Sequence, residues 1–159
     1  MVEWKVRNVR LTFFLAPDAS VPSDLWQTIV GEEPEDVSWQ RLQNLRIESG
    51  PVADGILKVL VQPMRIDCLH DPAETFGTPP EVLGSFPHAV DPLIGIMDPW
   101  LECDAFPTTP RIALGLTLHF ETRDRRAEYQ SLTQFVDGVP NRDEATDFMY
   151  QINRPVLRC

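Results

Sequence analysis

The chain predicts an α+β fold, with an antiparallel or mixed sheet of five to six strands and about three helices packed on one face. Two observations carry this prediction. Short segments with alternating apolar residues follow one another, with only a few helical patterns between them. Several of these segments are joined by tight-turn sequences such as Asp54-Gly55 and Pro63-Met64, which favour antiparallel neighbours. The expected order, β-α-β-β-β-loop-α-β-α-β, is typical of a sheet covered by helices on one side.

Length and composition predict a single domain, residues 1–159. A chain of 159 residues with 43% hydrophobic and 24% charged residues can bury a core without disulfide or metal staples. Its fifteen prolines favour short elements and fixed turns, because proline cannot donate a backbone hydrogen bond. We find no internal repeat and no linker that would divide two domains.

The start of the chain predicts a strand followed by a short helix. Residues 4–16 alternate, and the apolar side chains that would share one face are Val9, Leu11, Phe13 and Leu15. Ser23 is expected to cap a helix that runs to Val30, with Gly31 just after its end. The charged residues that follow, 31–36, are expected to form a loop.

Residues 39–48 fit two patterns. A helix would place Trp39, Leu42 and Leu45 on one side, whereas a strand would place alternate residues from Arg41 to Ile47 on one face. We favour the strand, because turn sequences at Gly50-Pro51 and Asp54-Gly55 then lead into the β-rich residues 56–62. Together with residues 65–70, these segments predict an antiparallel meander of three strands.

The rest of the chain alternates between a long loop, helices and strands. Residues 71–87 contain four prolines and no periodicity, so a long loop is expected. Residues 89–106 have helical character, with Pro92 suited to the first turn and Pro99 expected to kink or split the helix. The remaining predictions are a strand at 111–121, a helix at 123–136 and a last strand at 147–153.

The charge and the cysteine count limit the class of protein. The formal net charge of −10 argues against direct binding to nucleic acid or to anionic membranes, both of which need a basic surface. The sequence has no apolar run of membrane-spanning length and no signal-peptide pattern. Three cysteines without a framework spacing favour a reducing compartment. A soluble, cytoplasmic protein is the resulting expectation.

Residues 66–110 form an acidic, proline-rich segment with eight carboxylates, eight prolines and no Lys or Arg. No cation near in sequence neutralises its field, so we expect this segment to bind a protein partner, plausibly a basic one. The residues expected to make the contact are Asp71, Glu74, Phe76, Glu81, Phe86, Asp91, Asp98, Trp100, Glu102 and Asp104.

Aromatic residues beside the proline-rich loops have two interpretations. They could form a contact surface, because aromatic side chains bury a large area at modest entropic cost, or they could pack beneath the loops. These residues are Trp26, Trp39, Trp100, Phe76, Phe86 and Phe106.

Four residues of types that bind Zn²⁺ also occur in the acidic segment: Cys68, His70, His88 and Cys103. Cys-x-His on a strand places two of them on one face, but the spacing matches no paired-ligand pattern. A small buried cysteine beside a surface histidine is therefore the favoured interpretation. The chain also lacks the glycine-rich phosphate loop, the nucleophile elbow and the zinc-protease helix motif, and we expect no cofactor.

Two hypotheses about function follow. The first is a non-enzymatic interaction module, inhibitor or assembly subunit that docks through the acidic segment, with a basic nucleic-acid-binding protein as one target that fits. The alternative is a metal-dependent hydrolase that uses the Cys/His/Asp cluster. A homo-oligomer is compatible with both.

Overall fold

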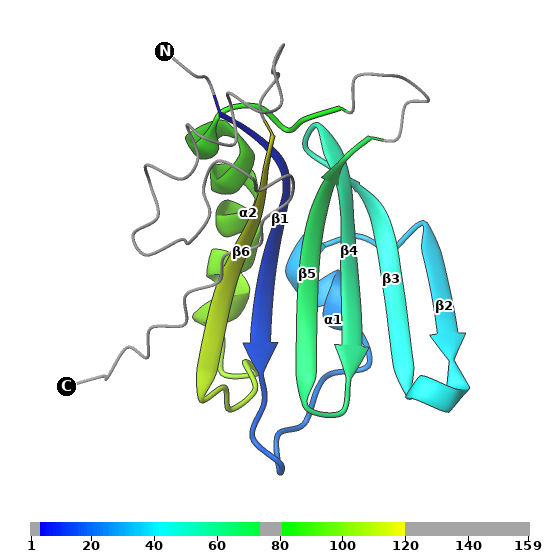
Figure 1. The fold of residues 1–159 in the computed structure, drawn as a ribbon. Helices are drawn as coiled ribbons and strands as arrows, with labels where there is room; N and C mark the ends of the chain where they lie inside the picture. Colours follow the sequence, from blue (N-terminus) through cyan, green and yellow to red (C-terminus); the bar gives the residue numbers. More distant parts are fainter. Residues whose placement is uncertain (1–3, 74–80, 120–159) are drawn as a thin grey trace, which may run out of the picture. The chain divides into compact units, whose positions relative to one another are not determined.

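The computed structural model describes residues 4–73 and 81–119 (Figure 1). By its internal contacts the chain divides into two units, Met1–Phe120 and Glu121–Cys159, and all described residues belong to the first. They form a six-stranded antiparallel sheet with two α-helices, so the fold is α+β and mostly sheet. The strands are β1 (Lys5–Phe14), β2 (Asp36–Gln40), β3 (Leu45–Val52), β4 (Gly55–Gln62), β5 (Arg65–Pro72) and β6 (Arg111–His119). The helices are α1 (Leu25–Val30) and α2 (Phe86–Leu101).

The strand order in the sheet is β2-β3-β4-β5-β1-β6. Short turns join β2 to β3, β3 to β4 and β4 to β5, and each of these strands pairs with the next. This arrangement confirms the predicted antiparallel meander. β1 then pairs with β5 on one side and with β6 on the other, so that Leu11 lies opposite both Cys68 and Leu114. Among the described strands, β2 and β6 are therefore the two edges of the sheet.

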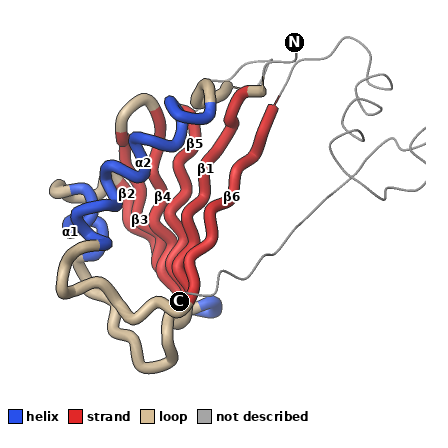
Figure 2. Tube along the Cα trace, turned by 90° about the vertical axis from the view of Figure 1, so that its left-hand side faces the viewer, coloured by secondary structure: helices blue, strands red, loops and turns tan. Residues whose placement is uncertain are grey.

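Both helices pack on the same face of the sheet, which we call the helix face (Figure 2). The apolar side chains of α1 and α2 recur at intervals of three or four residues, which places them on one side of each helix. The buried helical residues are Leu25, Trp26, Ile29, Ala89, Val90, Leu93, Met97 and Trp100. They pack against alternate residues of the strands, such as Phe13, Leu57 and Ile66, to form the core. We call the opposite side of the sheet, which no described element covers, the outer face.

The strand predicted at residues 39–48 is wrong, because this stretch belongs to two strands and the turn between them. β2 ends at Gln40, a single 3-10 turn covers Arg41–Gln43, and β3 begins at Leu45. Asn44 adopts a left-handed conformation with φ 46°, which Asn tolerates better than most residues and which reverses the chain. The alternation read across residues 41–47 therefore spans a hairpin.

The turns around this hairpin also differ in detail from the prediction. β3 continues through the expected turn at Gly50-Pro51, and the chain turns instead at Ala53-Asp54, where Ala53 has φ 50°. α1 begins after Asp24 rather than after Ser23. Its predicted end is confirmed, because Gly31 follows with φ 86°, a conformation that glycine adopts without strain.

α2 begins at Phe86, within the stretch predicted as a loop, and it continues past both of its internal prolines. Pro92 and Pro99 cannot donate to the carbonyls of His88 and Gly95, four residues earlier. Those two residues lie on the exposed side of α2, where a helix can lose a backbone hydrogen bond at lower cost than in the core. The expected split at Pro99 is absent, since α2 runs on to Leu101.

Two predicted elements, the helix at 123–136 and the strand at 147–153, lie outside the described residues. Within the described residues, which contain two α-helices, the predicted number of about three is not confirmed. No helix in this part of the chain is long and apolar enough to cross a membrane.

Candidate functional site

The solvent-facing side of α2 carries a row of carboxylates. Asp91, Asp98 and Glu102 are spaced by seven and four residues, which places them along one side of the helix, and Asp104 follows its end. All four are exposed, and none forms an ion pair with another described residue. We call these four residues the acidic ridge.

The ridge exists because α2 is amphipathic. Its buried residues, such as Leu93 and Met97, hold the helix against the sheet, so the remaining positions must face water. Gly95 lies between Asp91 and Asp98 on the exposed side and has open space around it. The carboxylates on either side of this glycine are exposed to solvent.

The other residues predicted to contact a partner are scattered. Asp71 lies on the outer face, where the Lys58 ammonium group is 3.3 Å from its carboxylate, so a cation from β4 neutralises it. Glu81 is exposed before α2, and the Phe86 side chain at the start of α2 is 52% exposed. Glu74 and Phe76 lie outside the described residues.

Trp100, which was also expected at the contact surface, lies in the core with 1% of its surface exposed. Its ring packs edge-to-face against Phe13 and Phe106, with ring centroids 5.1 and 4.8 Å apart. The packing explanation therefore describes Trp100 and Phe106, as it does Trp26, which is buried between α1 and the sheet. Of the described residues among these aromatics, Trp39 on β2 and Phe86 on α2 are the exposed ones.

Cys68 and His70 are both buried on the helix face of β5. The expected buried cysteine is confirmed, but the expected surface histidine is wrong, because His70 is two residues from Cys68 on the strand and therefore faces the same core. Burial, with a smaller effect of the Asp67 charge, raises the pKa of the Cys68 thiol far above its ordinary value, so this sulfur is poorly suited to act as a thiolate. His70 Nε2 lies 3.1 Å from the carbonyl oxygen of Val52. A side chain at Gly55 would collide first with the backbone carbonyl oxygen of Asp71 and then with this ring, 2.7 Å from Nε2, so the glycine makes room for both.

The two remaining candidate metal ligands lie elsewhere. His88 is exposed on α2, with Nε2 3.8 Å from a carboxylate oxygen of Asp54. Cys103 follows α2 and packs against the core. Across residues 4–73 and 81–119, no group of three or more His, Cys, Asp or Glu side chains is placed to hold a metal ion.

The sequence did not reveal a charged cluster on the outer face, centred on Asp67. This carboxylate accepts hydrogen bonds from Thr12 Oγ1 at 2.6 Å, Arg10 Nε at 2.9 Å and an Arg65 guanidinium nitrogen at 2.9 Å. Burial alone would raise the pKa of Asp67, but these hydrogen bonds outweigh it and hold the pKa below its ordinary value. Asp67 is therefore ionised and shared between two arginines.

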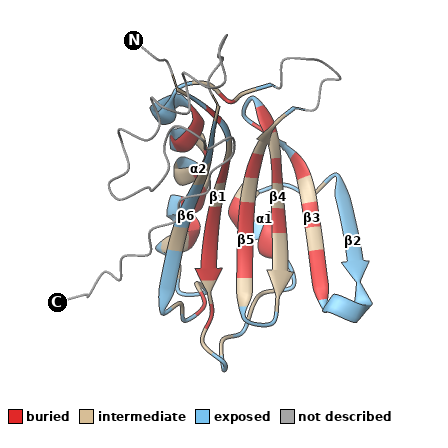
Figure 3. Ribbon diagram, viewed as in Figure 1, coloured by how far each residue is buried: buried red, intermediate tan, exposed pale blue. Residues whose placement is uncertain are grey.

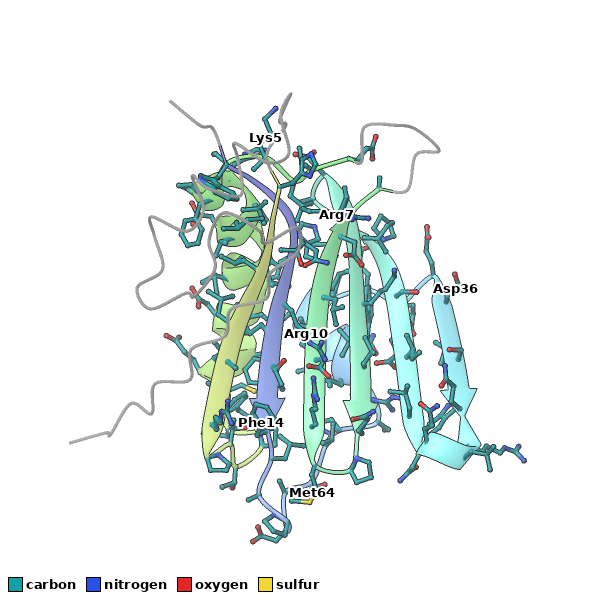
Figure 4. The ribbon with its side chains drawn as sticks, in the orientation of Figure 1. Lys5, Arg7, Arg10, Phe14, Asp36 and Met64 are labelled. Atoms are coloured by element: carbon teal, nitrogen blue, oxygen red, sulfur yellow. The ribbon has the colours of Figure 1, made fainter. Side chains whose placement is uncertain are left out.

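Phe14 extends this cluster along β1. The guanidinium carbon of Arg65 lies 5.7 Å from its ring centroid and that of Arg111 lies 4.7 Å away, one from each neighbouring strand. Figure 4 shows Arg10 and Phe14 along β1. Strand parity could have placed Arg10 and Phe14 on one face, but only the pairing of β1 with β5 and β6 brings in the other arginines.

Comparison of the chain with protein-family models, curated protein sequences and solved structures found no match in any of the three.

Proposed function

We propose that this protein is a non-enzymatic interaction module whose acidic ridge docks on a basic protein partner. The observation that carries the proposal is that three carboxylates lie along the exposed side of α2 without an ion pair to any described residue. Charges arranged in this way attract a partner of opposite sign and direct its approach. A basic nucleic-acid-binding protein is a partner class of suitable charge.

The metal-dependent hydrolase has less support. Cys68 and His70 are buried, and His88 lies on α2 at the surface. Asp67 and Asp71, which could otherwise bind a hard cation, are already paired with cationic side chains. We therefore propose the interaction module alone.

The test is co-purification with a charge-reversed ridge. The full chain would be expressed in its native host, and co-purifying proteins identified by mass spectrometry at low and at high salt. The variant D98K/E102K changes the net charge by +4, since two carboxylates become two ammonium groups, and it should lose a partner that the unmodified chain retains at low salt. High salt should release the same partner, because screening weakens contacts between exposed charges.

The matched control is D18K/D54K, which makes the same change of charge at two exposed carboxylates outside the ridge. This control should keep the partner. Loss of the partner in both variants would show that only the net charge matters, and retention in both would contradict a ridge contact. Absence of any salt-sensitive partner would overturn the proposed function.

A further inference from the structure

We infer that the edge of β2 that no described strand pairs with is a second docking surface, which takes an extended, basic segment of a protein partner as an added strand. The inference rests on the proposed function in one respect, namely that the chain binds a basic protein. It concerns a different surface, at the other end of the sheet order from β1 and β6, and different residues from the acidic ridge.

β2 is an unprotected edge within the described part of the chain. No described strand pairs with it on the side away from β3, and all five of its residues are exposed (Figure 3). The unpaired N–H and C=O groups of an edge strand can form a ladder with another extended chain. Most edges are protected by charged side chains or by proline, but β2 carries only one charge, at its first residue, Asp36.

Large apolar side chains lie along this edge and at its end. Val37, Trp39 and Leu42 are 54%, 61% and 104% exposed. Val37 and Trp39 share the helix face, opposite Glu48 and Arg46 of β3. Exposed apolar side chains that are grouped in this way, with a tryptophan among them, are typical of protein contact surfaces.

Trp39 is held in position by its neighbour. The guanidinium carbon of Arg46 lies 6.0 Å from the centroid of the Trp39 ring. Arg46 is itself fixed by hydrogen bonds to the carbonyl oxygens of Ser23, at 2.6 Å, and Pro22, at 3.2 Å. An aromatic side chain that is already oriented loses less conformational entropy when a partner covers it.

The charges beside β2 indicate that the added strand is basic. A run of exposed carboxylates leads into the strand, and none of them forms an ion pair within the described residues; Asp36, its last member, is labelled at the start of β2 in Figure 4. The run consists of Glu32, Glu33, Glu35 and Asp36. A segment with alternate apolar side chains could pair with β2 and cover its exposed apolar residues. Lys or Arg side chains near the start of β2 would at the same time form ion pairs with the acidic run.

A second copy of the chain fits the edge less well. An antiparallel pair centred on Ser38 would place Trp39 of one copy against Val37 of the other, which is favourable. However, each copy would bring the same acidic run, against a single Arg41 at the other end of the strand, and a net charge of −10. Repulsion between the copies therefore favours the basic segment.

The experiment titrates the isotope-labelled full chain with a synthetic peptide of alternating Val and Lys, of about eight residues, slightly longer than a typical strand. Backbone amide NMR signals of residues 36–40 should shift on binding. Raising the salt concentration should weaken the binding, and the same peptide interrupted by proline should not bind, since proline cannot complete the ladder.

Variants then separate this surface from the ridge. W39S should weaken peptide binding about tenfold or more, whereas F86S, at an aromatic residue of comparable exposure, should not. The variant D98K/E102K should still bind the peptide, so failure of the ridge proposal and failure of this inference give different results.

Three results would overturn the inference. Shifts confined to α2 would place the peptide on the ridge, and equal binding of a Val/Glu peptide would exclude charge recognition. Concentration-dependent dimerisation of the chain alone, abolished by W39S in analytical ultracentrifugation, would assign the edge to a second copy.

Discussion

Asp67 and Glu48 are buried carboxylates on opposite faces of the same sheet, and their surroundings shift their pKa values in opposite directions. Hydrogen bonds from three partners lower the pKa of Asp67 in spite of its burial. Burial raises the pKa of Glu48, and the charge of Arg46 and a hydrogen bond that the carboxylate accepts from the Trp26 backbone N–H only partly offset it. The number of charged hydrogen bonds, rather than burial alone, separates the two groups.

Asp67→Asn should lower the free energy of unfolding by about 2 kcal/mol at neutral pH. The loss is limited because the Arg10 and Arg65 side chains are 43% and 36% exposed and can regain water. Asp67 contributes stability above its ordinary pKa of 3.8, and that contribution is lost as the pH falls through its lower native pKa. Urea unfolding of the wild-type protein and D67N, measured from neutral to acidic pH, checks this prediction. The difference between their free energies of unfolding should become smaller as the pH falls.

The control for this prediction is Asp71→Asn, on the same face of β5. Asp71 has one cationic partner and is more exposed, so its loss should cost less than about 1 kcal/mol. Equal effects of the two substitutions, or a difference between wild type and D67N that does not change with pH, would contradict the role assigned to Asp67.

Glu48→Gln should reveal the opposite dependence on pH. Because the native pKa of Glu48 is raised above its ordinary value of 4.5, the wild-type protein gains stability relative to the variant as the pH falls towards 4.5. It loses this stability as the pH rises through the native pKa. Urea unfolding of the wild-type protein and E48Q at several pH values measures this change, with the exposed Glu32→Gln as the control. If the stability of the wild-type protein relative to E48Q increased with rising pH, the raised pKa of Glu48 would be refuted.

At the scale of the elements, the glycines of α2 and β3 have opposite roles. Gly95 lies in the middle of α2 with open space around it, whereas a side chain at Gly50 would lie 3.0 Å from the Trp26 ring. Gly50 therefore lets α1 lie close to the sheet. A side chain at Gly95 would meet none of the described residues, so packing does not require a glycine there.

Gly95→Ala should raise the free energy of unfolding by about 0.5–1 kcal/mol, because alanine loses less backbone entropy in a helix. Gly50→Ala should lower it, since the rigid Trp26 ring has to move to admit the new methyl group. Thermal or urea unfolding compares the two substitutions, which differ only in their position. A stabilising G50A would show that α1 can shift at little cost.

At the scale of the whole described unit, the sheet gathers cationic side chains from distant parts of the sequence on one face, while carboxylates elsewhere stay without an ion pair. Arginines from β1, β5 and β6 gather on the outer face around Asp67 and Phe14. Carboxylates remain unpaired on α2 and before β2. Both proposed surfaces are therefore acidic, and contacts with a basic partner at either one should weaken as salt is added.

The sequence was a good guide wherever one face of an element is buried. β1 and β6 were predicted from alternation, because residues two apart share a face of the sheet whatever its neighbours are. β4 and β5 were predicted from β-rich composition and from the tight turns beside them. It was a poor guide at β2, whose residues are all exposed and give no alternation to detect. The start of α2 was missed because proline discourages a helix, although Pro87 lies in the first turn, where proline is tolerated.

For the candidate sites, too, local properties were predicted from the sequence, and contacts between distant residues were not. The carboxylates of the acidic ridge were among the residues expected to contact a partner, because the lack of nearby Lys or Arg is a local property of the sequence. Their alignment along one side of α2 was not predicted, since the bounds of the helix were not. Burial of Trp100 and pairing of Asp71 with Lys58 were not predicted, since each depends on a strand distant in sequence.

The sequence by itself therefore determined the class of fold, most of the strands and the acidic character of residues 66–110. Those properties follow from local periodicity and composition. Only the tertiary structure decided which charges are neutralised, which aromatic rings are buried and which strand lies at the edge. Those outcomes depend on strand order and register, which bring together residues far apart in the chain, such as Arg10 and Asp67.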